Sequence, residues 1–137
     1  MDLDLFKIVV NASLFILIWI VQIVVYPGFN YYNESDLKKW HRVYTKRISF
    51  LVLPLMLSQL LVYLYSSVYN PVFSTVLIFA LILINWVITF FVAVPLHNAI
   101  DERVDTSAER RKLVSINWVR TFNWTIIFTL SILYYGK

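Results

Sequence analysis

The chain has 137 residues, of which 60% are hydrophobic, 18% are aromatic and 15% are charged. A soluble core of this size cannot bury so much apolar side chain, so the composition predicts an integral membrane protein that uses the lipid bilayer as its solvent. The absence of cysteine excludes disulfides, thiolate metal sites, iron–sulfur clusters and covalently attached c-type haem.

Four apolar stretches predict four membrane-spanning helices, because each is close to the roughly 20 residues that a helix needs to cross the hydrocarbon core. We therefore expect an all-α membrane protein, an antiparallel four-helix transmembrane bundle that forms a single domain over residues 1–137. The spans are predicted at about residues 8–26, 48–65, 72–96 and 113–134.

The first predicted span follows a short segment, residues 1–7, that lacks the basic region of a secretory signal. No small-residue cleavage site follows the span, so we expect this helix to be retained as a membrane anchor. Pro27 and Gly28 are predicted to end it, because proline disfavours helical geometry in the residue before it and glycine tolerates the turn.

The second helix is predicted to begin well before its apolar span. Asn33, with Asp36 three residues on, has the pattern of an N-terminal cap. Apolar, aromatic and histidine side chains then recur at helical spacing through a basic segment, at Leu37, Trp40, His41 and Tyr44. We expect this part of the helix to be amphipathic and to lie at the level of the lipid headgroups.

The third and fourth helices also carry start signals. Asn70 and Pro71 are typical of a cap followed by proline at the first helical position, and they leave almost no loop after the second helix. Thr106 and Glu109 have the spacing of a capping box at the start of the fourth helix. Kinks are expected at the prolines that lie inside or at the end of spans, Pro54 and Pro95.

The basic residues predict how the helices are oriented. The loop after the first span carries Lys38, Lys39, Arg42, Lys46 and Arg47, and the loop after the third carries Arg103, Arg110, Arg111 and Lys112. The loop between the second and third spans, residues 66–70, has none. By the positive-inside rule we expect a multi-pass protein of the cytoplasmic (inner) membrane, with basic loops inside and both termini outside. The net charge of +4 is thus a topology signal, and no nucleic-acid partner is expected.

Polar side chains gather at the cytoplasmic ends of the predicted spans, whereas the outer half of the bundle is mostly aliphatic and aromatic. Arg120 lies about seven residues inside the last apolar stretch. A charge at that depth is costly unless it finds partners, so it usually faces the bundle interior or a water-filled cavity. The side chains predicted to line a ligand-binding pocket are Gln22, His41, Thr89, His97, Asn117 and Arg120.

Within this pocket, Arg120 is predicted to bind an anionic or phenolic group and Asn117 to orient the arginine. His97 is predicted to act as a ligand or as an acid–base group, so His97 and Arg120 are the candidate catalytic residues. Whether the protein is an enzyme is left open at this point. The aromatic residues at the same level are expected to form an interfacial belt, namely Tyr26, Trp40, Tyr44 and Trp118.

Several occupants fit this pattern. His41 and His97, on adjacent helices, can serve as the axial ligands of a haem b. A non-haem metal would need a third ligand, for which Asp101 or Glu102 is in place. Without a metal, the pocket would hold a small hydrophobic ligand, such as a phenol, a quinone or part of a lipid. The alternative is a structural or accessory membrane subunit whose polar residues only join helices. Each of these interpretations is compatible with a homo-oligomer.

Several segments together resemble a group of small, functionally uncharacterised bacterial four-helix membrane proteins. They are Trp19–Gln22 running into Tyr26–Phe29, Trp40-His41, Pro54–Met56 with Gln59, Val94–His97, and Asn117–Thr121 followed by Trp124. Thr45 and Gln59 stand where that group tends to have histidine and glutamate. More distantly, the layout is similar to the anthrone-oxygenase-like family, which includes cofactor-independent oxygenases of polyketide phenols. The resemblance implies the four-helix fold and, as a further alternative, an oxygenase-like enzyme.

Overall fold

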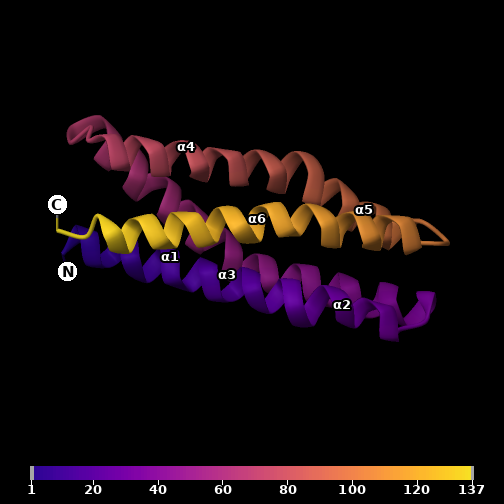
Figure 1. Ribbon diagram of the computed structural model, residues 1–137. Coiled ribbons are helices and arrows are strands. Elements are labelled where there is room, and N and C mark those ends of the chain that lie inside the picture. Colours follow the sequence, from indigo (N-terminus) through magenta and orange to yellow (C-terminus); the bar gives the residue numbers. More distant parts are fainter. Residues whose placement is uncertain (1, 137) are drawn as a thin grey trace.

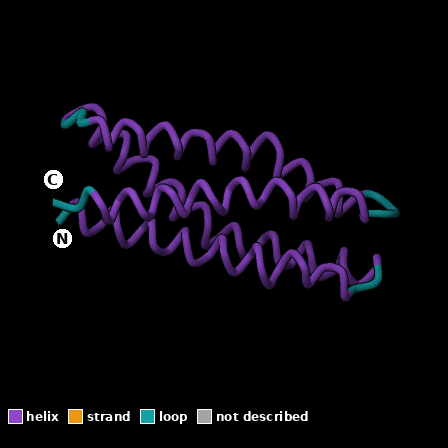
Figure 2. The backbone as a smooth tube through the Cα atoms, in the orientation of Figure 1, coloured by secondary structure: helices purple, strands orange, loops and turns teal. Residues whose placement is uncertain are grey.

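The computed structural model describes residues 2–136, which are mostly helical and contain no β-strand. Four long helical segments run lengthwise beside one another (Figure 1). They are Leu3–Tyr31, α3 (Glu34–Tyr69), Phe73–Glu102 and α6 (Ser107–Leu133). Figure 2 shows that loops are confined to the two ends of the molecule, with the α3–α4 connection at the end where both termini lie. The predicted all-α class is confirmed.

Two of the long segments change their helical type along their length. The first consists of α1 (Leu3–Ile20), the π-helical η1 (Val21–Val25), α2 (Tyr26–Gly28) and the 3-10 turn η2 (Phe29–Tyr31). The third consists of α4 (Phe73–Ile88), the π-helical η3 (Thr89–Ala93) and α5 (Val94–Glu102). All four segments are longer than the apolar stretches that predicted them, because polar turns extend them at one or both ends.

Three segments are long and apolar enough to cross a membrane, namely Leu3–Tyr31, Glu34–Tyr69 and Phe73–Glu102. The fourth, α6, is of similar length but carries more polar side chains in its middle. These side chains are buried between the helices rather than exposed, as Asn117, Arg120, Thr121 and Asn123 show. Large apolar side chains instead cover the outside, among them Phe50, Phe73 and Phe91, which are about four-fifths exposed. The polar groups in the middle of α6 are therefore inside, and much of the apolar surface of the bundle is outside.

Pro27 and Gly28 end the α-helical part of the first segment, as predicted, since α2 ends at Gly28 and only a 3-10 turn extends the segment to Tyr31. Proline lacks an N–H and its ring clashes with the carbonyl four residues earlier. For both Pro27 and Pro95, that earlier residue lies within a five-residue π-helical segment, η1 or η3. The wider π turn relieves the clash and lets the chain pass the proline as a helix.

The expected caps have different outcomes. Asn33 caps α3 as predicted, since its side-chain oxygen accepts the backbone N–H of Asp36 at 2.9 Å. The predicted start at Asn70 and Pro71 is wrong, because α4 begins at Phe73 without a side-chain cap. An extended residue at the N-cap position turns the chain there, so the helix begins two residues later than the proline pattern indicated.

The capping box predicted for the fourth helix is also wrong. Thr106 is the N-cap residue of α6, but its hydroxyl makes no capping bond, and Glu109 pairs with Arg103 instead. Asp105 provides the local contact, because its carboxylate accepts the backbone N–H of Ser107 at 2.9 Å. This bond favours the ionised carboxylate, so the pKa of Asp105 lies below its ordinary value.

In the half of the bundle near the termini, buried polar side chains form hydrogen bonds between helices. Asn11, on α1, accepts a hydrogen bond from the Gln59 amide at 2.7 Å and donates one to the Tyr63 hydroxyl at 2.9 Å. The Trp124 indole N–H, on α6, donates to the Gln59 side-chain oxygen at 3.3 Å. The buried apolar residues around them are Val10, Leu14, Ile18, Met56, Val62, Ile78, Ile82 and Ile127. This polar cluster fixes α1, α3 and α6 in register.

We expect Asn11→Leu to destabilise the protein by about 1 to 2 kcal/mol, because it removes both of these hydrogen bonds from an apolar interior. The loss would be measured as the unfolding free energy in mixed micelles with increasing dodecyl sulfate. Thr129→Val is the control, because the Thr129 hydroxyl is exposed and bonds only the Thr125 carbonyl of its own helix. An equal loss in both variants would mean that the Asn11 cluster does not hold the helices together.

Candidate functional site

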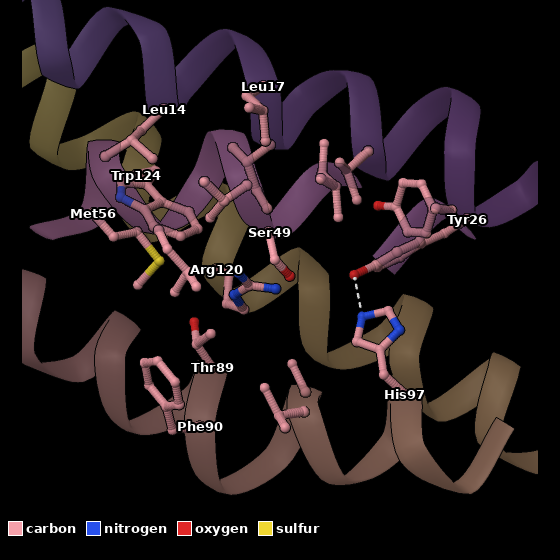
Figure 3. A pocket seen from close by; sticks show the side chains of 18 residues that line it. Leu14, Leu17, Tyr26, Ser49, Met56, Thr89, Phe90, His97, Arg120 and Trp124 are labelled. Atoms are coloured by element: carbon pink, nitrogen blue, oxygen red, sulfur yellow. Dashed lines mark hydrogen bonds between the residues drawn. The ribbon is translucent and has the colours of Figure 1, made fainter. Parts of the chain in front are cut away.

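A cavity of about 160 Å³ lies between the four helical segments (Figure 3). Its walls are mostly apolar and come from all four segments, including Leu14, Ile18, Val52, Met56, Phe90, Ala93 and Trp124. Polar side chains that line it are Tyr26, Tyr44, Ser49, Thr89, His97 and Arg120. Figure 3 shows Tyr26 and His97 together, with the Arg120 guanidinium between them and Trp124. The cavity thus has an apolar part and a polar part.

Arg120 is 6% exposed and is held by neutral groups. Its Nη1 donates to the Asn117 side-chain oxygen at 3.0 Å, and the Asn117 amide donates to the Gln22 oxygen at 2.8 Å. The guanidinium lies 5.1 Å from the centre of the Trp124 ring, and its Nε has no hydrogen-bond partner among the described residues. Within residues 2–136, no carboxylate lies within ion-pair distance of Arg120. A buried cation of this kind favours an anionic or electron-rich group beside it.

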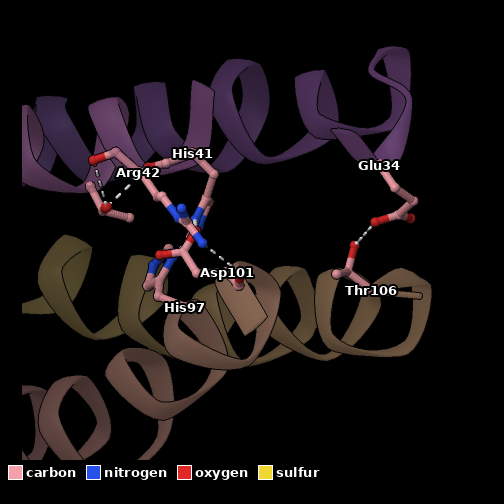
Figure 4. A network of polar contacts seen from close by, with 7 residues as sticks. Glu34, His41, Arg42, His97, Asp101 and Thr106 are labelled. Atoms are coloured by element: carbon pink, nitrogen blue, oxygen red, sulfur yellow. Dashed lines mark hydrogen bonds and ion pairs between the residues drawn. The ribbon is translucent and has the colours of Figure 1, made fainter. Parts of the chain in front are cut away.

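A second chain of hydrogen bonds runs from the surface to the cavity. The Asp101 carboxylate lies 2.7 Å from His41 Nδ1, and His41 Nε2 lies 2.8 Å from His97 Nδ1 (Figure 4). His97 Nε2 lies 3.1 Å from the Tyr26 hydroxyl, as Figure 3 marks. The chain therefore crosses from α5 to α3, back to α5 and then to α2.

Burial differs between the members of this chain, since His41 and Tyr26 are buried whereas Asp101 and His97 are partly exposed. The Asp101 side chain is 24% exposed, whereas the His41 side chain is fully buried between the edge of Phe29, at 5.5 Å, and the face of His97. Tyr26 is 3% exposed and lines the cavity. The Arg42 guanidinium donates to the Asp101 backbone carbonyl at 3.2 Å, which ties the end of α5 to α3.

The local sequence accounts for how the two cavity-facing ends are placed. Tyr26 is the first residue after η1, and His97 is the fourth residue after η3. Each π turn changes the angular position of the residues that follow it, and π turns frequently occur at functional sites. The two proline-linked π segments thus bring Tyr26 and His97, which are 71 residues apart in the sequence, within hydrogen-bond distance.

Of the six residues predicted to line the pocket, three do so directly, namely Thr89, His97 and Arg120. Gln22 and Asn117 lie behind Arg120, and His41 lies behind His97. Thr89 lines the wall, but its hydroxyl is bonded to the Asn85 carbonyl of its own helix at 2.7 Å. Fewer of the predicted side chains therefore reach the cavity directly than the sequence indicated.

Sequence reasoning missed the part played by two tyrosines. Tyr26 and Tyr44 are predicted to belong to an interfacial belt, but both are buried and both line the cavity. Trp40 and Trp118, by contrast, are partly exposed, as expected of belt residues. A signal is present at Tyr26, because a phenol next to a proline inside an apolar segment needs a hydrogen-bond partner when it is buried.

His41 and His97 are not placed as the two axial ligands of one haem b would be. A metal between two imidazoles lies about 2 Å from each nitrogen, so the two nitrogens must be about 4 Å apart. Here the facing nitrogens are 2.8 Å apart and bonded to each other, and the ring centres lie 5.0 Å apart in a stacked arrangement. For a non-haem metal, residues 2–136 contain no cluster of three or more histidine, aspartate or glutamate side chains arranged to hold an ion.

We therefore expect the protein purified in mild detergent to show only tryptophan and tyrosine absorption. The His41–His97 hydrogen bond leaves no space for iron between the two imidazoles. The check is an ultraviolet–visible spectrum recorded before and after reduction with dithionite. A Soret band that shifts on reduction, and that is lost in His41→Ala, would contradict the geometry described above.

Comparisons with known proteins identify no relative. The resemblance to small four-helix membrane proteins and to the anthrone-oxygenase-like family therefore remains a prediction from the sequence, and function is inferred from the cavity. No protein-family model matches this chain, and neither a curated protein nor a solved structure shows significant similarity to it.

Proposed function

We propose that this protein is an integral membrane protein that binds a small phenolic or quinone-like molecule inside an antiparallel four-helix transmembrane bundle. The observation that carries the proposal is the cavity of about 160 Å³, which has apolar walls and, at one side, the buried cation of Arg120 without a carboxylate partner in residues 2–136. Ligand sites with this combination of apolar walls and few convergent polar groups are typical of small-molecule binding proteins.

The distribution of side chains supports the membrane location. Three segments have the length and hydropathy of spanning helices, and exposed phenylalanines and leucines surround the bundle. We place α6 in the membrane as the fourth span, because the polar side chains in its middle, from Asn117 to Asn123, are buried against other helices. With basic loops on the cytoplasmic side, the cavity lies in the cytoplasmic half of the inner membrane, and both termini lie outside.

The cavity sets the size and chemistry of the ligand. Drug-sized ligands occupy pockets of roughly 300 to 1,000 Å³, so a cavity of about 160 Å³ fits a single ring or the head of a larger molecule. An oxygen on that ring would accept from Arg120, whose Nε–H has no partner among the described residues, while the ring would contact Met56, Phe90 and Trp124. A phenol, or a quinone with its two carbonyl oxygens, meets both requirements.

The test is direct binding to the protein in lipid nanodiscs, with empty nanodiscs as the control for partitioning. We expect 4-nitrophenol to quench tryptophan fluorescence in a saturable way, because Trp124 lines the cavity. Toluene, which has the ring but no oxygen, should bind at least about tenfold more weakly. If 4-nitrophenol shows no saturable binding, or if toluene binds equally well, the ligand proposal fails and the structural or accessory subunit becomes the better reading.

A further inference from the structure

We propose that Asp101, His41, His97 and Tyr26 form a proton relay that takes the proton from a phenol bound in the cavity and passes it to the protein surface. The bound molecule would then be a phenolate held against Arg120. This inference rests on the proposed binding function and adds an activity to it, namely general-base activation of a phenol or enol. Chains of aspartate and histidine inside membrane proteins are known to serve as proton relays.

The direction of every hydrogen bond in the relay follows from the Asp101 end. An ionised carboxylate only accepts hydrogen bonds, so His41 carries its proton on Nδ1 and donates to Asp101. Neutral His41 then has an acceptor at Nε2, which must receive the proton on His97 Nδ1. His97 Nε2 is left as an acceptor and receives the Tyr26 O–H. One surface carboxylate therefore orients the whole chain away from the cavity.

At the cavity end, this orientation leaves the Tyr26 oxygen as an acceptor, with one lone pair toward Arg120 and one for a molecule in the cavity. Since its only proton points to His97, Tyr26 can accept a hydrogen bond from a molecule in the cavity. The Arg120 guanidinium faces the same hydroxyl and supplies only donors. A ligand oxygen placed between them would donate its proton to Tyr26 and accept from Arg120, which is the arrangement that ionises a phenol.

The proton balance is simple. The ligand O–H bond breaks and a new O–H bond forms on Tyr26, while Tyr26 passes its own proton to His97 Nε2. The proton on His97 Nδ1 moves to His41 Nε2, and the proton on His41 Nδ1 moves to Asp101. Asp101 then releases a proton to water, and both imidazoles keep their protons on Nε2 while the phenolate is bound. When the ligand leaves, Asp101 takes up a proton from water, and the reverse shift returns one proton to the ligand oxygen and both rings to their starting tautomers. No oxidant, metal or second substrate takes part in this step.

The relay has one open end at the surface and one end at the cavity. Asp101 and His97 are both partly exposed, but of these two only His97 lines the cavity, so Asp101 is the end that meets water. The charged or titratable groups around the chain are Arg42, Tyr44 and Arg120. A continuation toward the opposite end of the bundle is blocked at Trp124, because its indole N–H donates to Gln59 and has no acceptor with which to receive a proton. The geometry therefore supports activation of a bound ligand and does not support proton transport across the bundle.

The test uses 4-nitrophenol, whose phenolate has a visible absorption band that the neutral phenol lacks. Wild-type protein in nanodiscs is mixed with the dye at a pH where the free dye is neutral. We expect bound dye to show the phenolate band and, in weakly buffered solution, release of about one proton per dye bound. Binding itself is followed separately by tryptophan fluorescence.

Variants then separate the relay from the charge of Arg120. Asp101→Asn and Tyr26→Phe should still bind the dye, but the phenolate fraction should fall at least about tenfold. The first variant loses the carboxylate that accepts the proton and orients the chain, and the second loses the hydroxyl that accepts the proton from the dye. Glu102→Gln is the matched control, since it removes an exposed carboxylate next to Asp101 and should leave the band unchanged.

Each outcome is informative. Dye bound by the wild type as the neutral phenol, without proton release, overturns the relay and leaves the binding function standing. A phenolate band that persists in Asp101→Asn also overturns it, because Arg120 alone would then explain the ionisation. Absence of any saturable binding overturns the proposed function together with the relay. The wild-type proton release keeps the test valid even if a variant fails to fold.

Discussion

Arg120→Leu is expected to weaken 4-nitrophenol binding by about 100-fold while leaving the protein folded. Among the residues that line the cavity, the guanidinium provides the charge-assisted donors, and loss of such a bond in a dry site costs roughly 2 to 5 kcal/mol. The bundle should tolerate the change, because Arg120 has no carboxylate partner in residues 2–136 and its removal leaves no opposite charge buried alone. Binding would be measured by tryptophan quenching, and folding by thermal unfolding in the same nanodiscs.

The matched control for this prediction is Arg111→Leu. Arg111 lies on the same helix, α6, but is exposed and does not line the cavity. The Arg111→Leu substitution should leave the affinity for 4-nitrophenol unchanged. If Arg120→Leu binds the dye as tightly as the wild type, the cation is a structural group and the phenolic ligand class must be abandoned.

Ala93→Phe is expected to abolish ligand binding by filling the cavity from η3. Ala93 is buried and lines the cavity, so a phenyl group added there would occupy the space proposed for the ligand ring. We expect the unfolding free energy to stay within about 1 kcal/mol of the wild type, because apolar packing of the new ring in the void offsets the strain of rearranging its neighbours. Dye binding should become undetectable, at least about 100-fold weaker, since the ligand must displace a packed side chain.

Ala80→Phe is the control for the filled cavity. Ala80 lies earlier in the same helical segment but is exposed on its outer side, so the same substitution there should leave both binding and stability nearly unchanged. Dye binding that survives in Ala93→Phe would place the ligand outside the cavity. Together with Arg120→Leu, this variant separates the shape of the site from its charge.

Much of the fold could be predicted from the sequence, because the signals involved are local. Apolar length and helical spacing identified the four segments, and the start of α3 at Asn33 followed from its capping pattern. The pairing of Asn117 with Arg120 could also be anticipated, since residues three apart on a helix lie on the same face. The depth of Arg120 in an apolar segment indicated that it needed partners inside the bundle.

The polar contacts between helices could not be predicted in the same way. The bonds from Asp101 to His41, from His41 to His97 and from His97 to Tyr26 join residues 56 to 71 positions apart. They depend on how far each helix is rotated about its axis and shifted along its neighbour, and periodicity within one helix contains neither quantity. The sequence therefore placed both histidines in one layer but could not show that they bond to each other rather than face each other across a metal.

The π turn before Pro27 could not be predicted for a similar reason. Local rules correctly predict that the α-helix ends at proline and glycine, but they do not indicate the π turn η1 that precedes them. That turn places Tyr26 against His97, and so turns an expected belt residue into the cavity end of the polar chain. The amino-acid sequence thus established which helices form and which side chains are polar, whereas the packing between helices established which of those side chains meet, because contact between distant residues depends on three-dimensional register.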